Sequence, residues 1–230
     1  MRPARRVPLA HGAPPGTFRV MPHIVLLGDS IFDNAAYVAG GPDVVTQLAE
    51  LLPPGWRATL AAVDGAVVAD VARQLARVPA DATHLVVSAG GNDALGHADL
   101  LDRPARSSAQ VLGWLADAVE AFEARYRRML AVVLARGLPM MVCTVYNGNL
   151  GPPAQRLATT ALAVFNDAIL RAAAEHGLPV IELRLVCTEA ADYANPIEPS
   201  VRGGRKIARA IASAVAEARP AAGGAPRLGA

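Results

Sequence analysis

Cysteine is scarce in this sequence, with two residues among 230. Cys143 and Cys187 fall in or beside predicted strands, where an unpaired cysteine behaves as a small buried hydrophobe. This usage excludes a disulfide framework, and we expect a reducing compartment, with the cytoplasm as the location. The sequence also lacks a P-loop, a dinucleotide-binding glycine fingerprint and a cluster with metal-ligand spacing. Nothing in it therefore indicates a bound nucleotide or metal ion.

A surplus of positive charge is lacking over most of the chain, although the formal net charge of the whole sequence is +2. Four of the 22 Lys and Arg residues lie in residues 1–20, which hold no Asp or Glu, so the remainder has 18 basic residues against 20 acidic ones. A nucleic-acid-binding domain needs a basic surplus to neutralise phosphates. We therefore expect no nucleic-acid partner.

Long uncharged apolar runs are absent too, so we expect no membrane span and no membrane partner. Residues 1–20 carry four prolines but no apolar core of a secretory signal, and Met21 stands two residues before the first predicted strand. We expect residues 1–20 to be a disordered extension and residues 219–230, rich in Pro, Gly and Ala, to be a frayed tail. Residues 21–218 contain no linker and are long enough for one domain.

What the sequence does contain is organised around residues 23–30, which read H-I-V-L-L-G-D-S. Four consecutive apolar residues, Ile24 to Leu27, are typical of a strand buried on both faces. The Gly-Asp-Ser that follows places the Ser30 hydroxyl at the carboxyl end of this strand, where ligands bind in open α/β sheets. Ser30 is therefore a candidate nucleophile.

Strands alternate with helices along the rest of the chain. Further strands are predicted over residues 57–63, 85–88, 140–145 and 180–183, and helices over residues 44–52, 67–78, 107–136, 154–176 and 203–218. Gly-Leu-Pro ends two of these helices, because Gly adopts the left-handed conformation and Pro prevents continuation. The alternation predicts an α/β fold, a three-layer α/β/α sandwich around a five-stranded parallel sheet. A flavodoxin-like strand order of 2-1-3-4-5 would bring the first three strand ends together.

The first three strands end in loops of related composition. They carry Gly28-Asp29-Ser30, Asp64-Gly65 and Gly90-Gly91-Asn92-Asp93. Acyl transfer needs a nucleophile, a base that takes its proton, and hydrogen-bond donors for the oxyanion. Ser30 suits the first role. Gly65, with an unobstructed backbone amide, and Asn92, with a side-chain amide, suit the third.

These three blocks, in this order and at successive strand ends, resemble the signature blocks of the SGNH (GDSL) hydrolase family. The resemblance extends over roughly residues 21–218. It implies that Ser30 is the nucleophile and that its own amide, Gly65 and Asn92 form the oxyanion hole. It further implies a small-molecule carboxylic ester or acyl substrate, and no metal or organic cofactor.

The last signature block of that family is altered in this sequence. The family has Asp, two residues, His, then Pro and a Gly that opens the final helix, and residues 195–203 read N-P-I-E-P-S-V-R-G. By this resemblance Glu198 stands at the position of the catalytic His, and Asn195 at that of the orienting Asp. The two changes are physically consistent, because the Asp acts by holding an imidazole and would repel Glu198.

Three hypotheses follow for the base. Glu198 acts as a carboxylate base, although an unperturbed Glu, with a pKa of about 4.3 against about 6.5 for His, is weak at neutral pH unless burial raises its pKa. Alternatively, the site binds a ligand without turnover. In the third hypothesis His97, four residues after the third block, takes the role. We rank them in this order.

Each motif also has a plain structural interpretation. Ser30 or Asp29 suits a helix cap or a turn, and Asn92-Asp93 suits a local turn. Glu198 suits a solvated loop position or a charge near the final helix. Residues 146–149 favour a turn over a place in the crevice. The apolar stripe on the longest predicted helix indicates core along its whole length, and its members are Val111, Leu115, Ala118 or Val119, Phe122, Tyr126, Met129 and Val133.

Overall fold

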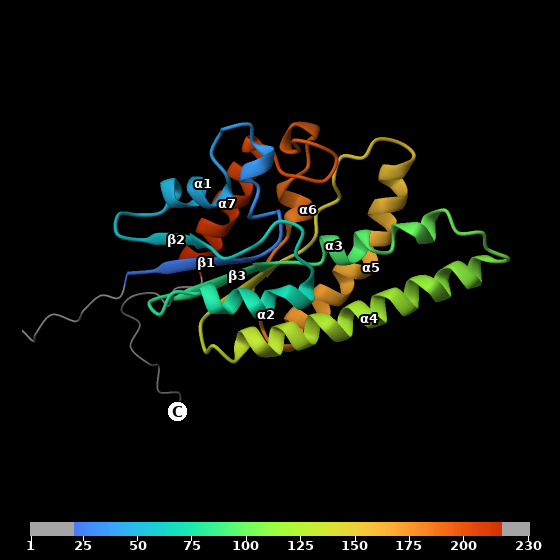
Figure 1. Ribbon diagram of the computed structural model, residues 1–230, viewed down its shortest axis with the longest axis horizontal. Coiled ribbons are helices and arrows are strands. Elements are labelled where there is room, and N and C mark those ends of the chain that lie inside the picture. Colours follow the sequence, from blue (N-terminus) through green and yellow to red (C-terminus); the bar gives the residue numbers. More distant parts are fainter. Residues whose placement is uncertain (1–20, 218–230) are drawn as a thin grey trace, which may run out of the picture.

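A parallel sheet of five strands runs through the centre of the molecule in a computed structural model that describes residues 21–217. The expected extension (1–20) and tail (219–230) lie outside the described residues. The strand order, β2-β1-β3-β4-β5, is the predicted one (Figure 1). The strands are β1 (His23–Gly28), β2 (Arg57–Leu60), β3 (His84–Ser88), β4 (Met140–Cys143) and β5 (Val180–Ile181), and every neighbouring pair is parallel.

Helices cover both faces of this sheet, as the sequence predicts. One face carries α1 (Val44–Leu51) and α7 (Val201–Glu217), and the other carries α2 (Val71–Gln74), α4 (Ser108–Leu134) and α5 (Ala154–Glu175), as Figure 1 shows. Successive residues of a strand point to opposite faces. In β1, Val25 and Leu27 therefore join the core beneath α4 and α5, while Ile24 and Leu26 join the core beneath α1 and α7. The result is a three-layer sandwich with two apolar cores.

Short helices and 3-10 turns follow most of the strands. They are α3 (Gly91–Leu95) and α6 (Leu183–Val186), with the 3-10 turns η1 (Ala35–Tyr37), η2 (Val68–Asp70), η3 (Leu75–Arg77), η4 (Ala98–Leu101) and η5 (Ala190–Asp192). Apart from η3, each begins within about a dozen residues of a strand's carboxyl end. They turn the strand-end loops into short, ordered segments around the candidate site.

The prediction of a single helix over residues 67–78 is wrong, because this segment is divided into η2, α2 and η3. Two carboxylates fix its start: Asp70 accepts from the amide of Val67 (3.0 Å), and Asp93 accepts from the amide of Val68 (2.8 Å). Asp93 belongs to α3, so the break depends on a contact between segments distant in the sequence. Helical spacing of apolar residues cannot reveal such a contact.

Three predicted strands are also shorter in the structure. After Leu60, the amides of Ala61 and Ala62 both donate to the carbonyl of Leu26, at 2.8 and 2.9 Å, which ends the regular ladder of β2. The strand predicted over residues 140–145 ends at Cys143, and Leu183, predicted to end the fifth strand, instead begins α6. All three differences lie at the carboxyl edge of the sheet, where the chain is diverted into loops.

The two Gly-Leu-Pro junctions behave as predicted, with Gly137 at φ 68° and Gly177 at φ 62° after α4 and α5. Both cysteines are buried and free. By length and composition α5 is the one helix of the described residues that could cross a membrane. However, its residues Phe165, Ala168 and Ile169 are buried within the core beneath the sheet, so α5 fits the description of a core helix.

The long helix α4 reaches beyond the sheet at its amino-terminal end (Figure 1). From Ala118 to Val133 its apolar stripe is core, as predicted. The prediction is wrong for the start of the stripe, because Val111 is 41% exposed. The first turns of α4 extend past the strand ends and have no sheet to cover. Instead, Val111 and Leu115 of these turns line a cavity.

Candidate active site

The turn that carries Ser30 is fixed by the end of β1. Gly28 has φ +129°, and a Cβ built on it would lie 1.7 Å from the carbonyl oxygen of Ser88, so this position requires glycine. The buried Gln74 side chain pairs with both backbone groups of Gly28, accepting from its N–H at 2.8 Å and donating to its C=O at 2.7 Å. Two amides of the turn then donate to the carbonyl of Asp29. Ser30 therefore leaves the sheet in a defined direction, with its hydroxyl in a cavity.

Ser30 donates its only side-chain hydrogen bond to Glu198. The distance from Ser30 Oγ to Glu198 Oε1 is 3.1 Å, although the two residues lie 168 positions apart. Glu198 is 6% exposed, and its second oxygen, Oε2, is buried with no hydrogen-bond partner. Burial raises the pKa of this carboxyl, the bond from Ser30 lowers it, and the charge of Asp64 raises it further. Glu198 is therefore not a solvated loop acid.

The loop that presents Glu198 is held from several sides. Asn195 Oδ1 accepts from the amides of Ile197 and Glu198, both at 2.9 Å, so Asn195 sets the backbone of this turn. Tyr146 donates its hydroxyl to the carbonyl of Ile197 at 2.6 Å. The buried Asn34, near the serine turn, donates to the carbonyl of Pro199 at 3.2 Å. The loop is thus joined directly to the segment that carries the serine.

An ion pair anchors the start of the same loop on α7. Asp192 is fully buried and accepts from Lys206 Nζ at 2.7 Å and from the amides of Thr188 and Glu189. The nearby cation and amides lower the pKa of Asp192 although burial opposes this. A charged anchor of this kind restricts the positions that Glu198 can take.

The two other residues expected in the oxyanion hole lie on adjoining loops. Asn92 Nδ2 donates to the carbonyl of Ala66 at 2.9 Å, which uses one of its two hydrogens and links α3 to the loop that holds Gly65. Asn92 is thus not a local turn former. The backbone amides of Ser30 and Gly65 make no hydrogen bond within residues 21–217. Gly65, with φ +74°, lines a separate open hollow rather than the cavity shared by Ser30, Asn92 and Glu198.

A second buried acid precedes the serine. Asp29 is 3% exposed, and its Oδ1 accepts from the amide of Ile31 at 3.1 Å. Burial, with smaller effects from the charges of Glu198 and Asp93, raises the pKa of Asp29 to about 7. Sequence reasoning treated Asp29 only as a cap or turn residue. Its burial beside another acid was not predictable from the Gly-Asp-Ser block.

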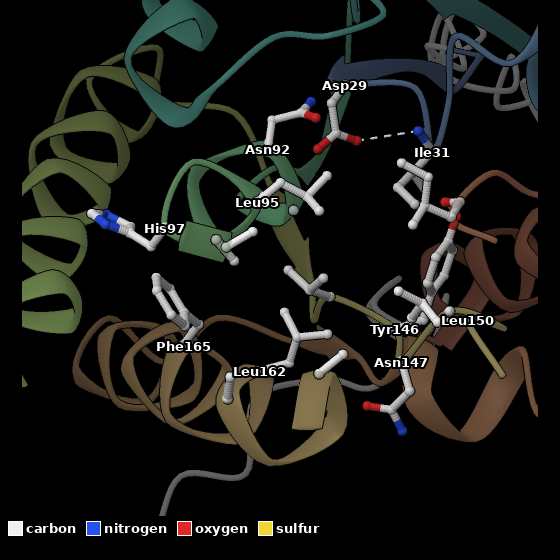
Figure 2. Close-up of a pocket in the computed structure, with 18 of the residues that line it drawn as sticks. Asp29, Ile31, Asn92, Leu95, His97, Tyr146, Asn147, Leu150, Leu162 and Phe165 are labelled. Atoms are coloured by element: carbon white, nitrogen blue, oxygen red, sulfur yellow. Dashed lines mark hydrogen bonds between the residues drawn. The ribbon is translucent and has the colours of Figure 1, made fainter. Parts of the chain in front are cut away.

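His97 lines the same cavity but at a distance from this cluster. Its ring lies beside Phe165, with the ring centroids 6.3 Å apart. Figure 2 shows the pair on the side of the cavity away from Ile31 and Tyr146. Within the described chain, no histidine hydrogen-bonds Ser30, and the Oγ proton is directed to Glu198. Of the two candidate bases, only Glu198 is in place.

The cavity itself has a volume of about 240 Å³. Tyr146, Asn147 and Gly148 line it. The prediction that residues 146–149 form a turn outside the crevice is therefore wrong for the first three of them. Tyr146 is buried because its ring packs edge-on against Tyr193 (centroids 5.1 Å apart) while its hydroxyl bonds the Glu198 loop. The position of Tyr146 directly after the fourth strand was the signal that could have identified it.

Comparison with known proteins identifies the family of this chain. The model of the GDSL-like lipase/acylhydrolase family matches residues 26–223. The chain therefore belongs to this family. No curated protein matches the sequence.

Several solved structures share the fold at low sequence identity. The extracellular lipase of Streptomyces rimosus superposes with a TM-score of 0.65 at 19% identity over 84% of this chain and 99% of the lipase. Phospholipase A1 of Streptomyces albidoflavus superposes with a TM-score of 0.63 at 19% sequence identity, over 84% of this chain and 99% of the phospholipase. A member of the lipolytic G-D-S-L family from Veillonella parvula superposes with a TM-score of 0.60 at 17% sequence identity, over 83% of this chain and 96% of that protein. These similarities establish the fold.

Proposed function

We propose that this protein is a serine ester hydrolase that forms an acyl-enzyme on Ser30 with Glu198 as its base. The observation that carries the proposal is the hydrogen bond from Ser30 Oγ to Glu198 Oε1 at 3.1 Å. A base must lie within hydrogen-bond reach of the proton it removes, and Glu198 meets this condition. Membership of a family of lipases and acylhydrolases supports the reaction class.

The first half of the reaction uses the carboxylate as a base and then as an acid. Ser30 Oγ forms a bond to the carbonyl carbon of the ester while its proton passes to Glu198. The carbonyl electron pair moves to the oxygen, which becomes the oxyanion. When the intermediate collapses, the bond from carbon to the leaving oxygen breaks, and protonated Glu198 returns the proton to that oxygen. In the second half, Glu198 takes a proton from water, whose oxygen attacks the acyl carbon. When this second intermediate collapses, the bond from carbon to Ser30 Oγ breaks, Glu198 returns the proton to Oγ, and the carboxylic acid is released.

The oxyanion needs donors that no other acceptor occupies. The amides of Ser30 and Gly65 make no hydrogen bond within residues 21–217, and Asn92 retains one amide hydrogen. We assign the oxyanion hole to the Ser30 amide and Asn92, which share the cavity, and to Gly65, which lies outside the cavity lining but next to Ala66, the acceptor of the Asn92 amide. Donors that are fixed before the reaction stabilise the developing charge without reorganisation.

The environment of Glu198 makes a carboxylate a usable base. By resemblance this residue occupies the position of the family's histidine, and a carboxylate of ordinary pKa is too weak a base near pH 7. Burial of Glu198 and its unpaired Oε2 raise its proton affinity. The carboxyl is thereby brought closer to the proton affinity that general-base catalysis at neutral pH requires.

Replacement of the nucleophile tests this proposal. Ser30→Ala should abolish hydrolysis of p-nitrophenyl esters while the melting temperature stays within a few degrees of the wild-type value. Ser213→Ala, on the exposed face of α7, is the matched control and should retain full activity. Esterase activity that survives in purified Ser30→Ala would exclude Ser30 as the nucleophile.

The buried state of Glu198 also favours a second function, binding of an acyl ligand without turnover. If the raised pKa keeps the carboxyl protonated at working pH, Ser30 has no base, and the cavity serves only for binding. A wild-type protein that hydrolyses no ester between pH 5 and 9 but binds a carboxylic acid would support this alternative.

A further inference from the structure

The cavity beside Ser30 has a polar end and an apolar end. Among the described residues that line it, Asp29 and Glu198 are the only ones with Asp, Glu, Lys or Arg side chains, and both lie at the Ser30 end. Figure 2 shows Leu162, Phe165 and His97 on the side away from Tyr146. The ring of His97 lies beside Phe165. This end presents mainly carbon atoms to whatever occupies it.

Three segments contribute apolar side chains to the cavity, and on α5 and α4 these stand at helical spacing. On α5, Ala158, Ala161, Leu162 and Phe165 recur at i, i+3, i+4 and i+7, so one helical face is turned to the cavity. Val111 and Leu115 of α4 stand one turn apart opposite to them, and the α3–η4 segment adds Leu95 and Leu101. The small side chains Ala158 and Ala161 leave room between the helices.

Several large aliphatic side chains of the cavity lining are exposed to water. Leu95 is 45% exposed, Leu101 52% and Val111 41%. Contiguous exposed apolar surface is unfavourable in water and commonly marks a binding site. An apolar occupant would remove these side chains from water, whereas a sugar or phosphate would place most of its polar groups against carbon atoms, with the His97 ring as a polar partner at this end.

We infer that the apolar end binds an aliphatic acyl chain of medium length, such as the octanoyl group of an ester. The inference rests on the proposed function. Glu198 must protonate the leaving oxygen, so the leaving group lies beside Glu198, and the acyl chain extends from Ser30 to the opposite end, toward Leu162 and Phe165. An acetyl group would leave this space empty.

The experiment compares p-nitrophenyl acetate, butanoate, hexanoate and octanoate as substrates of the wild-type protein and of Ala161→Phe, in which a phenyl ring fills the apolar end. In the wild type, kcat/KM should rise with chain length, by up to about fourfold for each methylene group buried. In Ala161→Phe, the ratio of octanoate to acetate kcat/KM should fall at least tenfold. Ala163→Phe, on the exposed side of the same helix, is the matched control and should keep the wild-type ratio.

A binding measurement separates failure of this inference from failure of the proposed function. Calorimetric titration of Ser30→Ala with octanoate should show binding that Ala161→Phe in the same background loses. Binding of octanoate without hydrolysis of any ester would sustain the acyl site and reject the enzyme. Ester hydrolysis with equal kcat/KM for acetate and octanoate, or with the same ratio in Ala161→Phe, would overturn the acyl site and leave the enzyme intact. Absence of both binding and hydrolysis would reject both.

Discussion

At the scale of single residues, the account depends on one carboxyl group with two requirements. Glu198 must be buried enough to hold a proton more tightly than an ordinary Glu, yet it must be ionised to accept the proton of Ser30. Its environment meets the first requirement, because burial raises its pKa and its Oε2 has no partner. The bond from Ser30 favours the ionised form and so serves the second.

Glu198→Gln should therefore lower kcat by about 100-fold or more, the usual contribution of a general base, with KM changed by only a few-fold. The amide keeps the shape of the side chain but cannot accept the proton. Wild-type kcat should rise with pH through an ionisation above the ordinary Glu value of 4.5, because the protonated carboxyl is inactive. This rise should be absent in Glu198→Gln.

Steady-state kinetics from pH 4 to 8 would show both effects. Glu120→Gln, an exposed position on α4, is the matched control and should reproduce the wild-type profile. A wild-type rate in Glu198→Gln would assign the base elsewhere.

At the scale of elements, the loop over residues 187–200 holds the base in place. Asn195 contributes through two backbone amides of that loop and not through the Glu198 carboxyl, in contrast to the orienting role that the resemblance attaches to its position. Asp192 and Lys206 fix the start of the loop, and Tyr146 fixes its end. Each of these contacts restricts the position of Glu198.

Asn195→Ala should leave these two amides without their acceptor. We expect a loss of about 0.5–1.5 kcal/mol of unfolding free energy, because the exposed part of this turn can bond to water instead, and a several-fold fall in kcat, because Glu198 becomes less well positioned. Asn195→Asp retains an acceptor oxygen and should restore most of the stability. Urea denaturation together with esterase kinetics would test this, and unchanged stability in Asn195→Ala would show that the turn does not depend on its side chain.

The elements of the sheet were predictable because their signals are local. A strand buried on both faces is a continuous apolar run, and Ile24 to Leu27 is such a run. The caps at Gly137 and Gly177 were predictable because each depends on one residue. The segment over residues 67–78 was not, because its start at Val68 is fixed by the Asp93 carboxylate of α3, 25 residues away.

The site was predictable to the extent that it lies at strand ends. Ser30 and Asn92 follow β1 and β3, and the strand order brings them to one cavity. Contact between Ser30 and Glu198 depends on a loop whose position is set by Asn34, Tyr146 and Lys206, so the sequence supported a hypothesis about the base but no geometry. The apolar end of the cavity arises because α4 extends past the sheet. Its apolar residues have the same helical spacing as core residues, so the sequence pattern cannot tell a cavity wall from core.

At the scale of the whole molecule, the buried acids beside the site cost stability. The pKa of Asp29 is about 7 in the folded protein against an ordinary value of 3.8. Between about pH 4 and 7 the native state therefore holds a proton that the unfolded chain has released, and the unfolding free energy falls by up to about 1.4 kcal/mol per pH unit as pH rises. Above pH 7 the full penalty for the buried charge is present.

Asp29→Asn should therefore raise the melting temperature at pH 8 by several degrees and change it little at pH 3, where the Asp29 side chain is neutral in both the folded and the unfolded state. The amide oxygen can still accept from Ile31. Thermal denaturation of both proteins at the two pH values tests the sign, with Asp117→Asn, an exposed position on α4, as the control. An equal shift at both pH values would mean that the effect of Asp29 is not one of charge.

The most direct test of the central claim, activation of Ser30 by Glu198, is the rate at which a fluorophosphonate labels Ser30. Intact mass and peptide mapping should show one adduct, on Ser30, in the wild-type protein at pH 7.5. Labelling should be slowed by about 100-fold in Glu198→Gln and unchanged in Glu120→Gln. A wild-type serine that stays unlabelled, or equal labelling rates with Glu and Gln at position 198, would contradict the account.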